Sequence, residues 1–372
     1  MFDCAWGFRT LAVAGLAGDE AEAMTAPSAI FDVMTIRAPA VAPELARDVA
    51  RRLWGIDGDL RPLTGERDAN FRLRAADGRQ YVLKFANPAE DAGFRDMQVA
   101  ALRHIARRAP DLPVPRVVAL PDGGVEAPVA LASGETCHVR LLSWIDGLPV
   151  GLSRRSAAQR AAAGEILGRL QDALSGFSHP ASPPPIVWDL AHSLAMREVA
   201  EVLPPAVREA LLPILDDFEA EVTPIQPQLR RQVVHNDFNH ANILVDPNDH
   251  ARIAGVIDFG DMAETAVVFD AAIAAHSQNG KDMPIAEAAG HMLRRYHGEW
   301  PLLPEEIAIL PLLMATRAIM SVTLACYHHH AQPDNDHYAA AMSRISDRLA
   351  FVAELRDPAT ARCLRRACGA PS

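Results

Sequence analysis

The chain has 372 residues, of which about half are hydrophobic and 22% are charged, which is typical of a globular protein large enough for two lobes. Its formal net charge of −11 argues against a nucleic-acid partner, because phosphate backbones are bound by clustered Lys and Arg. We recognise no apolar run of membrane-spanning length, and the five cysteines lack CxxC spacing, so we expect a cytoplasmic protein without a membrane partner, disulfide framework or zinc site.

Residues 1–40 are predicted to be a poorly structured N-terminal extension. The sequence before about Pro39 shows no sustained helical or strand period. The apolar stretch 11–17 is similar to the core of a secretory signal peptide. A signal peptide is disfavoured because the stretch is short and only one basic residue, Arg9, precedes it. Met24 is a second plausible start.

Removal of residues 1–23 is expected to leave turnover and thermal stability unchanged, because nothing in this stretch has the period of a packed element. The measurement compares activity and unfolding temperature of the chain that starts at Met24 with those of the full chain. Loss of folding in the shortened chain would contradict this expectation.

Residues 41–145 are predicted to form the first lobe, a nucleotide-binding antiparallel sheet with a helix. Apolar residues at helical spacing over 43–56 predict a helix that leads into it. Alternating apolar residues on both sides of Asp77-Gly78 predict an antiparallel hairpin over 70–85. A helix over 94–108 and strands over 116–120 and 138–145 complete this lobe.

Residues 146–372 are predicted to form a larger, mostly helical lobe. Helical periodicity dominates there, apart from a Pro-rich loop over 179–185 and a strand pair over 233–245 and 251–259. The expected fold class is therefore α+β.

The strand pair carries the decisive motif, HxDxxxxN at 235–242, followed by Asp-Phe-Gly at 258–260. Phosphoryl transfer needs a carboxylate that orients the attacking hydroxyl and oxygen ligands that hold Mg²⁺ on the phosphates. Asp237 is the candidate for the first role, and Asn242 and Asp258 are the candidates for the second. A loop leaving one strand can present Asp237 and Asn242 to a common centre to which the next strand returns Asp258.

Lys84 lies at the end of the apolar strand 81–85. Its functional interpretation is pairing with the phosphates of a nucleotide, and its alternative is a solvated charge on a sheet edge. The downstream motif favours the functional interpretation.

The order of Lys84, HxDxxxxN and Asp-Phe-Gly resembles the aminoglycoside phosphotransferase and choline kinase superfamily, over about Pro43 to Asp357. The resemblance implies a bilobal protein-kinase-like fold with a small antiparallel-sheet N-lobe and a larger, mostly helical C-lobe. Five stretches look like the hydroxylysine kinase branch: 65–71, 81–84, 98–102, 114–116 and 138–142.

Two departures from the kinase pattern concern the nucleotide site. The loop expected to cover the phosphates has a single glycine, Gly65, and Gln98 stands where a glutamate partner of the lysine is expected. Gln98 is expected to accept a hydrogen bond from Lys84 without contributing a charge. The resemblance also implies that the backbone between Leu142 and Trp144 bonds the purine, although Trp144 could equally be a core residue.

The resemblance implies an amino alcohol or hydroxylated amino acid as the acceptor. Hydroxylysine-like compounds come first, followed by choline, ethanolamine, homoserine or an aminoglycoside. A cationic amine would need a carboxylate, for which Asp261 is the best candidate and Asp189 a second, unless Asp189 is a helix N-cap. The carboxylate of an amino acid would need a cation such as Arg317, unless Arg317 forms a structural salt bridge.

The sequence thus predicts a kinase that uses Mg²⁺ and ATP or GTP to phosphorylate a small, cationic substrate, as a monomer or homodimer. The alternative of another class is a catalytically silent nucleotide-binding module, suggested by Gln98 and the phosphate loop. A protein kinase is disfavoured because no Ala-Pro-Glu segment follows Asp258.

Overall fold

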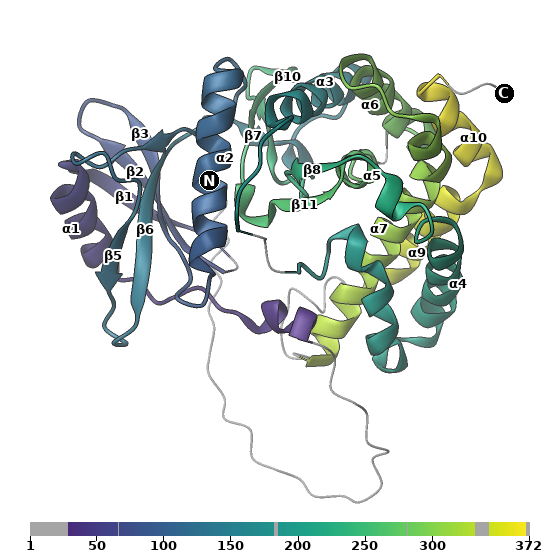
Figure 1. Cartoon of the computed structure of the whole chain (residues 1–372), viewed down its shortest axis with the longest axis horizontal. Helices are drawn as coiled ribbons and strands as arrows, with labels where there is room; N and C mark the ends of the chain where they lie inside the picture. The colour runs from purple at the N-terminus through teal and green to yellow at the C-terminus, as the bar shows by residue number, and fades with distance from the viewer. Residues whose placement is uncertain (1–28, 66, 182–184, 281, 332–341, 370–372) are drawn as a thin grey trace, which may run out of the picture.

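The computed structural model describes residues 29–65, 67–181, 185–280, 282–331 and 342–369. A lobe built on an antiparallel sheet stands beside a larger helical lobe, and helix α2 (Ala92–Arg108) lies between them (Figure 1). The predicted α+β, protein-kinase-like arrangement of two lobes is confirmed.

The N-lobe sheet has the strand order β1-β2-β3-β6-β4, with β5 also paired to β6, and all pairs are antiparallel. Helix α1 (Pro43–Trp54) packs on one face of this sheet. The strands are β1 (Gly58–Leu63), β2 (Ala69–Ala75), β3 (Gln80–Phe85), β4 (Val117–Val118), β5 (Ala127–Ala130) and β6 (Thr136–Ser143).

Strand β3 shows how the sheet positions the site. Tyr81, Leu83 and Phe85 are buried in the core shared with α1, whereas Val82 and Lys84 point to the other face and line the cleft between the lobes. Successive side chains of a strand alternate between the two faces, so one period-2 pattern builds both the core and the cleft wall. The predicted hairpin is confirmed, with Gly78 at a positive φ of 86° in its turn.

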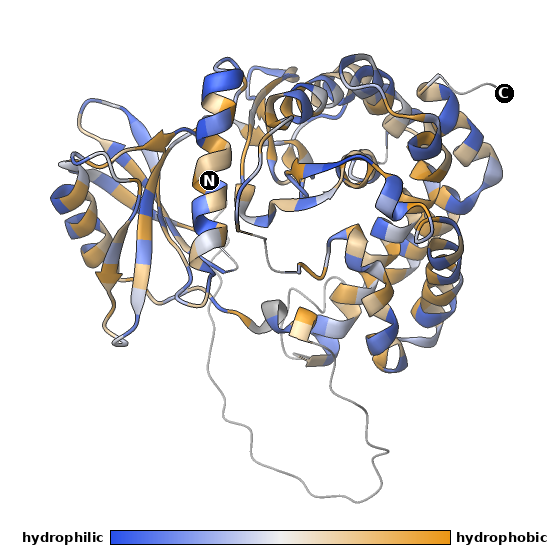
Figure 2. Cartoon of the chain, viewed as in Figure 1, coloured by the Kyte–Doolittle hydropathy of each residue, from blue (hydrophilic) through white to orange (hydrophobic). Residues whose placement is uncertain are grey.

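Helices α3, α5, α6 and α7 and the inner side of α2 surround the core of the C-lobe. Figure 2 shows hydrophobic and hydrophilic residues mixed along the outer helices α4 and α10, as expected for helices that bury one side. The helices are α3 (Ala157–Leu174), α4 (Pro205–Glu221), α5 (Val267–His276), α6 (Ile285–Glu299), α7 (Pro304–Ala331), α9 (Ile345–Arg356) and α10 (Pro358–Ala367).

Short strands and 3₁₀ helices of the C-lobe carry the loops that face the N-lobe. Two small antiparallel sheets have the orders β10-β9-β7 and β11-β8. The strands are β7 (Leu148–Pro149), β8 (Arg231–Val234), β9 (Ile243–Asp246), β10 (Asp249–Val256) and β11 (Ala263–Ala266). The 3₁₀ helices are η2 (Val150–Leu152), η3 (Leu190–Val202), η4 (Gln226–Gln228) and η5 (Phe259–Asp261).

Helix α7 corrects the expectation that no apolar run reaches membrane-spanning length. Its 28 residues are long and apolar enough to cross a membrane, but 78% of its most apolar window is buried inside the protein. The helix packs in the C-lobe core, where an all-round apolar surface is needed because neighbours surround it.

The N-terminal extension is also more structured than expected in its second half. Residues 1–28 lie outside the described part of the chain, but Ala29–Thr35 form the 3₁₀ helix η1. Phe31 is only 3% exposed and belongs to the C-lobe core. A single buried aromatic residue has no period, which is why the sequence pattern did not reveal this contact.

Candidate active site

The loop between β8 and β9 holds the HxDxxxxN motif, and His235 anchors it. Nε2 of His235 lies 3.0 Å from the carbonyl oxygen of Ile257, and its ring packs against Phe259 at 4.8 Å between centroids. Burial lowers the pKa of His235, so its buried ring is neutral at pH 7. This contact ties the loop to the strand end that carries Asp258.

Asp237 and Asn242 converge as their spacing predicts. The side-chain amide of Asn242 donates to Asp237 Oδ2 at 2.7 Å and to the Asp237 carbonyl at 3.0 Å. Asn239 donates to the other carboxylate oxygen, Oδ1, at 2.8 Å. Two amide donors therefore fix the orientation of the Asp237 carboxylate at the edge of the cleft.

Asp258 follows β10 in a left-handed backbone conformation with φ of 62°. Its Oδ1 accepts a hydrogen bond from the amide of Gly260 at 3.3 Å, and both Asp258 and Asn242 line the same cleft as Asp237. A positive φ is rare for residues other than glycine and marks a position held by its surroundings. The carboxylate is thereby directed into the cleft rather than along the strand.

The donor set of Asn242 and Asp258 fits a divalent cation that is also held by phosphates. Magnesium sites of this kind use one or two protein oxygen ligands plus the phosphates of the substrate. In the described part of the chain, no group of three or more His, Cys, Asp or Glu is placed to hold a metal ion by itself. Two protein oxygen ligands therefore suit a metal that phosphates also hold.

Arg317 of α7 lies beside Asp237, with 3.5 Å between its Nη2 and Asp237 Oδ1. Burial and the carboxylate of Asp261 raise the pKa of Asp237 to about 7, against the opposing charge of Arg317 and the hydrogen bond from Asn239. The side chain of Arg317 is 11% exposed. Its ion pair with Asp237 agrees with the interpretation of Arg317 as a member of a structural salt bridge.

Lys84 lines the cleft as predicted, but its partner is Asp68 and not Gln98. Lys84 Nζ lies 2.6 Å from Asp68 Oδ2, whereas Gln98 donates to Glu90 Oε1 at 3.0 Å and accepts from Arg140. Burial would raise the pKa of Asp68, but the charge and hydrogen bond of Lys84 hold it below its ordinary value.

The register of the β2–β3 hairpin explains this partner. Asn70 is the Cα partner of Lys84, so Asp68, two residues earlier, lies at the same end of the ladder. The Asp-x-Asn spacing before the strand was the signal that sequence reasoning missed.

Asp261 lines the cleft, where it pairs with Arg67 from the N-lobe loop that contains Gly65. The Arg67 guanidinium also lies 5.1 Å from the centroid of the Trp188 ring. A carboxylate and an aromatic face together form a favourable environment for a cation. Burial raises the pKa of Asp261, and the charge of Arg67 opposes that rise.

Asp189 is the N-cap of η3. Its side chain accepts from the Ala191 amide at 2.9 Å and from Thr265 Oγ1 at 3.2 Å. It is buried, and its contacts agree with the interpretation of Asp189 as a helix cap.

Asp270 of α5, four residues into that helix, supports the loop from behind. Its carboxylate accepts from the backbone amide of Asn236 at 2.9 Å and from Gln171 Nε2 at 2.7 Å. Asn236 has a positive φ of 63°, so Asp270 holds a strained position directly before Asp237. Burial raises the pKa of Asp270 to about 7.

Replacing Asp270 with alanine is expected to lower turnover at least tenfold and to destabilise the fold by about 2 to 4 kcal/mol, because two buried donors lose their acceptor. Nucleotide affinity should change little, since Asp270 does not line the cleft. Steady-state kinetics, calorimetric nucleotide titration and urea unfolding would measure these effects. Asp270→Asn, which keeps one acceptor oxygen, should recover part of both losses, and a variant with normal turnover would contradict this role.

The cleft has a volume of about 960 Å³, and its lining is partly apolar. The apolar side chains of Val82, Leu142, Trp144 and Leu244 contribute to it, in keeping with a planar base. The backbone amide of Trp144 donates to the Gln80 carbonyl at 3.0 Å. Backbone bonding of a purine by the Trp144 amide is therefore excluded in this conformation, because that donor is already used within the sheet.

Comparisons with known proteins agree with this geometry. The sequence profile described as "Phosphotransferase enzyme family" matches residues 59–304. Hydroxylysine kinase of Danio rerio is 25% identical over 321 residues, covering 82% of this chain and 89% of that protein. Hydroxylysine kinase of Mus musculus is 26% identical over 302 residues, covering 75% and 80%.

Solved structures show the same fold. A microcompartment-associated aminopropanol kinase superimposes with a TM-score of 0.65 at 20% identity, covering 84% of this chain and 94% of that one. The amicoumacin kinase hAmiN, in complex with AMP-PNP, Ca²⁺ and Ami, superimposes with a TM-score of 0.64 at 16% identity, covering 85% and 93%. At these identities the likeness concerns the fold alone.

Proposed function

The chain belongs to the phosphotransferase enzyme family and is a small-molecule kinase with an alcohol acceptor, and we propose that this acceptor is a hydroxylysine-like amino alcohol or hydroxylated amino acid. The observation that carries the proposal is the convergence of Asp237, Asn242 and Asp258 on one cleft beside the carboxylate of Asp261. The relatives named hydroxylysine kinase support the choice of acceptor.

In the proposed reaction Asp237 positions the acceptor hydroxyl. The hydroxyl oxygen attacks the γ-phosphorus, the bond from that phosphorus to the β–γ bridging oxygen breaks, and the nucleoside diphosphate leaves. Asp237 accepts a hydrogen bond from the hydroxyl and finally takes its proton. Support for this role comes from the two amides of Asn239 and Asn242, which hold the carboxylate in one orientation.

The proposed co-substrate is ATP or GTP with Mg²⁺, for which Asn242 and Asp258 are the protein ligands. The metal supplies charge neutralisation on the phosphates when bound. Lys84 would exchange Asp68 for a phosphate oxygen. The tight loop before β2 requires glycine at position 65. A Cβ atom there would lie 2.4 Å from the carbonyl oxygen of Asp68, which is a steric clash.

Asp261 is proposed to bind the ammonium group of the acceptor, with the Trp188 ring beside it. Support comes from Arg67, whose guanidinium pairs with Asp261 and lies over the Trp188 ring, in the environment that a cation prefers. An acceptor ammonium would replace Arg67 at this carboxylate. Arg67 would then be free to approach the phosphates, because it also lines the cleft.

The deciding experiment incubates the full chain with ATP or GTP, Mg²⁺ and one acceptor at a time, and measures release of nucleoside diphosphate. Hydroxylysine should give the highest kcat/KM, ahead of ethanolamine, choline, homoserine and an aminoglycoside. Deaminated analogues should lose most of it, because they carry no ammonium group that could pair with Asp261. Equal kcat/KM values for neutral alcohols and for amines would contradict the proposed acceptor class.

The rival of another class, a catalytically silent nucleotide-binding module, is not favoured by the relatives, which are named hydroxylysine kinase. The rival predicts a thermal shift with nucleotide and Mg²⁺ but no turnover with any acceptor. The presence of Asp237, Asn242 and Asp258 together favours the enzyme. We further propose a cytoplasmic location and a monomer or homodimer.

A further inference from the structure

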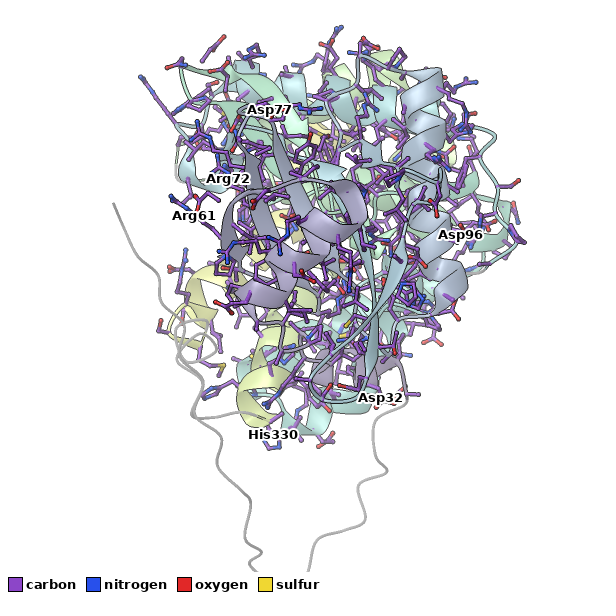
Figure 3. The ribbon with its side chains drawn as sticks, turned by 90° about the vertical axis from the view of Figure 1, so that its left-hand side faces the viewer. Asp32, Arg61, Arg72, Asp77, Asp96 and His330 are labelled. Carbon is purple, nitrogen blue, oxygen red and sulfur yellow. The ribbon has the colours of Figure 1, made fainter. Side chains whose placement is uncertain are left out.

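The segment 29–37 crosses from one lobe to the other beside the cleft. Figure 1 shows it as the purple stretch that runs below α2 towards α7. In the C-lobe, the ring of Phe31 lies 5.4 Å from that of Tyr327 on α7, between centroids. Figure 3 accordingly places Asp32 at the same lower end of the molecule as His330, near the end of α7.

The other end of the segment is fixed to the N-lobe. Asn87 Nδ2 donates to the carbonyl of Arg37 at 2.8 Å and to the carbonyl of Arg67 at 2.9 Å. The amide of Asn87 in turn donates to Asp68 Oδ1 at 2.9 Å. One asparagine thus joins the segment to the loop that carries Arg67 and Asp68.

Both attachments are made to elements that also carry charged groups of the site. Arg67 reaches Asp261, and α7, which holds Phe31, also carries Arg317 beside Asp237. Ala29, Ile30 and Ile36 line the same cleft as these groups, and Pro185 and Ile186 extend the apolar surface. The segment therefore adds apolar side chains to the cleft that Asp237 and Asp261 line.

We propose that Ala29, Ile30 and Ile36, which lie outside the stretch matched by the family profile, form the acceptor wall of this kinase and select acceptors with an aliphatic chain between hydroxyl and ammonium. The inference rests on the proposed function and deepens it. Methylene groups would pack on Ile30 and Ile36, whereas the ring hydroxyls of an aminoglycoside would meet this wall without hydrogen-bond partners.

The test measures kcat and KM for hydroxylysine, for an aminoglycoside and for the nucleotide in full-length Ile30→Ala and Ile36→Ala. Leu152→Ala is the matched control, because Leu152 is an aliphatic side chain that is 75% exposed and does not line the cleft. The wall variants should lose about tenfold or more in kcat/KM for hydroxylysine, mainly through KM, and lose less or gain with the aminoglycoside. Nucleotide KM and unfolding temperature should stay close to those of the control. The proposed acceptor wall is wrong if the acceptor kinetics stay unchanged, or if the KM of the nucleotide changes as much as that of hydroxylysine.

A labelling experiment separates this inference from the proposed function. In a full-length Cys4→Ser and Cys363→Ser background the remaining cysteines, Cys137, Cys326 and Cys368, are buried, so Ile30→Cys reports on the wall. Hydroxylysine should slow maleimide labelling of this thiol at least threefold, and nucleotide with Mg²⁺ should not. If only the nucleotide, or neither compound, slows labelling of this thiol, the proposed acceptor wall is wrong. If hydroxylysine slows labelling but is not phosphorylated, the acceptor wall is supported and the proposed reaction is wrong.

Discussion

Asp237→Asn is expected to lower turnover by about two to four orders of magnitude, because the amide cannot accept the proton of the acceptor hydroxyl. Nucleotide affinity should stay nearly intact, since Asn242, Asp258 and Lys84 still face the cleft. The substitution changes the charge of the group with little change in its shape. Its effect should therefore appear in kcat far more than in the KM of the nucleotide.

Steady-state kinetics with the best acceptor and calorimetric titration of nucleotide, with and without Mg²⁺, check this expectation. Asp249→Asn is the matched control, because Asp249 is an exposed aspartate at the start of β10, at the far end of the hairpin. Turnover of Asp237→Asn within tenfold of the control would mean that another group positions the hydroxyl.

Asp258→Asn is expected to weaken turnover and nucleotide binding together. Loss of groups that merely orient metal ligands costs 10- to 100-fold in metal affinity or activity, so loss of a direct ligand should cost about that much or more. Asparagine tolerates a positive φ, so the backbone at 258, with φ of 62°, should be kept. The difference between Asp258→Asn and the unchanged protein therefore reports the loss of the carboxylate charge and not a change in backbone conformation.

The dependence on Mg²⁺ distinguishes the two carboxylates. Nucleotide affinity of Asp258→Asn should fall about tenfold or more in the presence of Mg²⁺ and change little in its absence, because the lost ligand acts through the ion. Equal losses of nucleotide affinity in Asp237→Asn and Asp258→Asn would show that the roles of the two carboxylates are wrongly assigned.

Several features could be predicted from the sequence because they depend on neighbours along the chain. The alternation in β3 and the Asp-Gly turn before it predicted the hairpin that places Lys84 on the cleft. The spacing of Asp237 and Asn242 predicted their convergence, since a single short loop connects β8 to β9. Asp258 joined them because it closely follows β10, the strand paired with β9.

The partners of these groups were decided only by the tertiary structure. Lys84 pairs with Asp68 because of hairpin register, and Gln98 is occupied by Glu90 and Arg140. The distinct roles of Asp189 and Asp270 depend on which buried donors face them.

The longest-range contacts have the weakest signal in the sequence. Arg67 and Asp261 are 194 positions apart, and Phe31 meets Tyr327 across nearly the whole chain. Periodicity reports which face of an element is buried but not what lies against that face, so a contact between distant segments leaves no local pattern. The sequence by itself determined the fold class and the three groups of the motif, and packing between the lobes decided which charges and which apolar wall surround them.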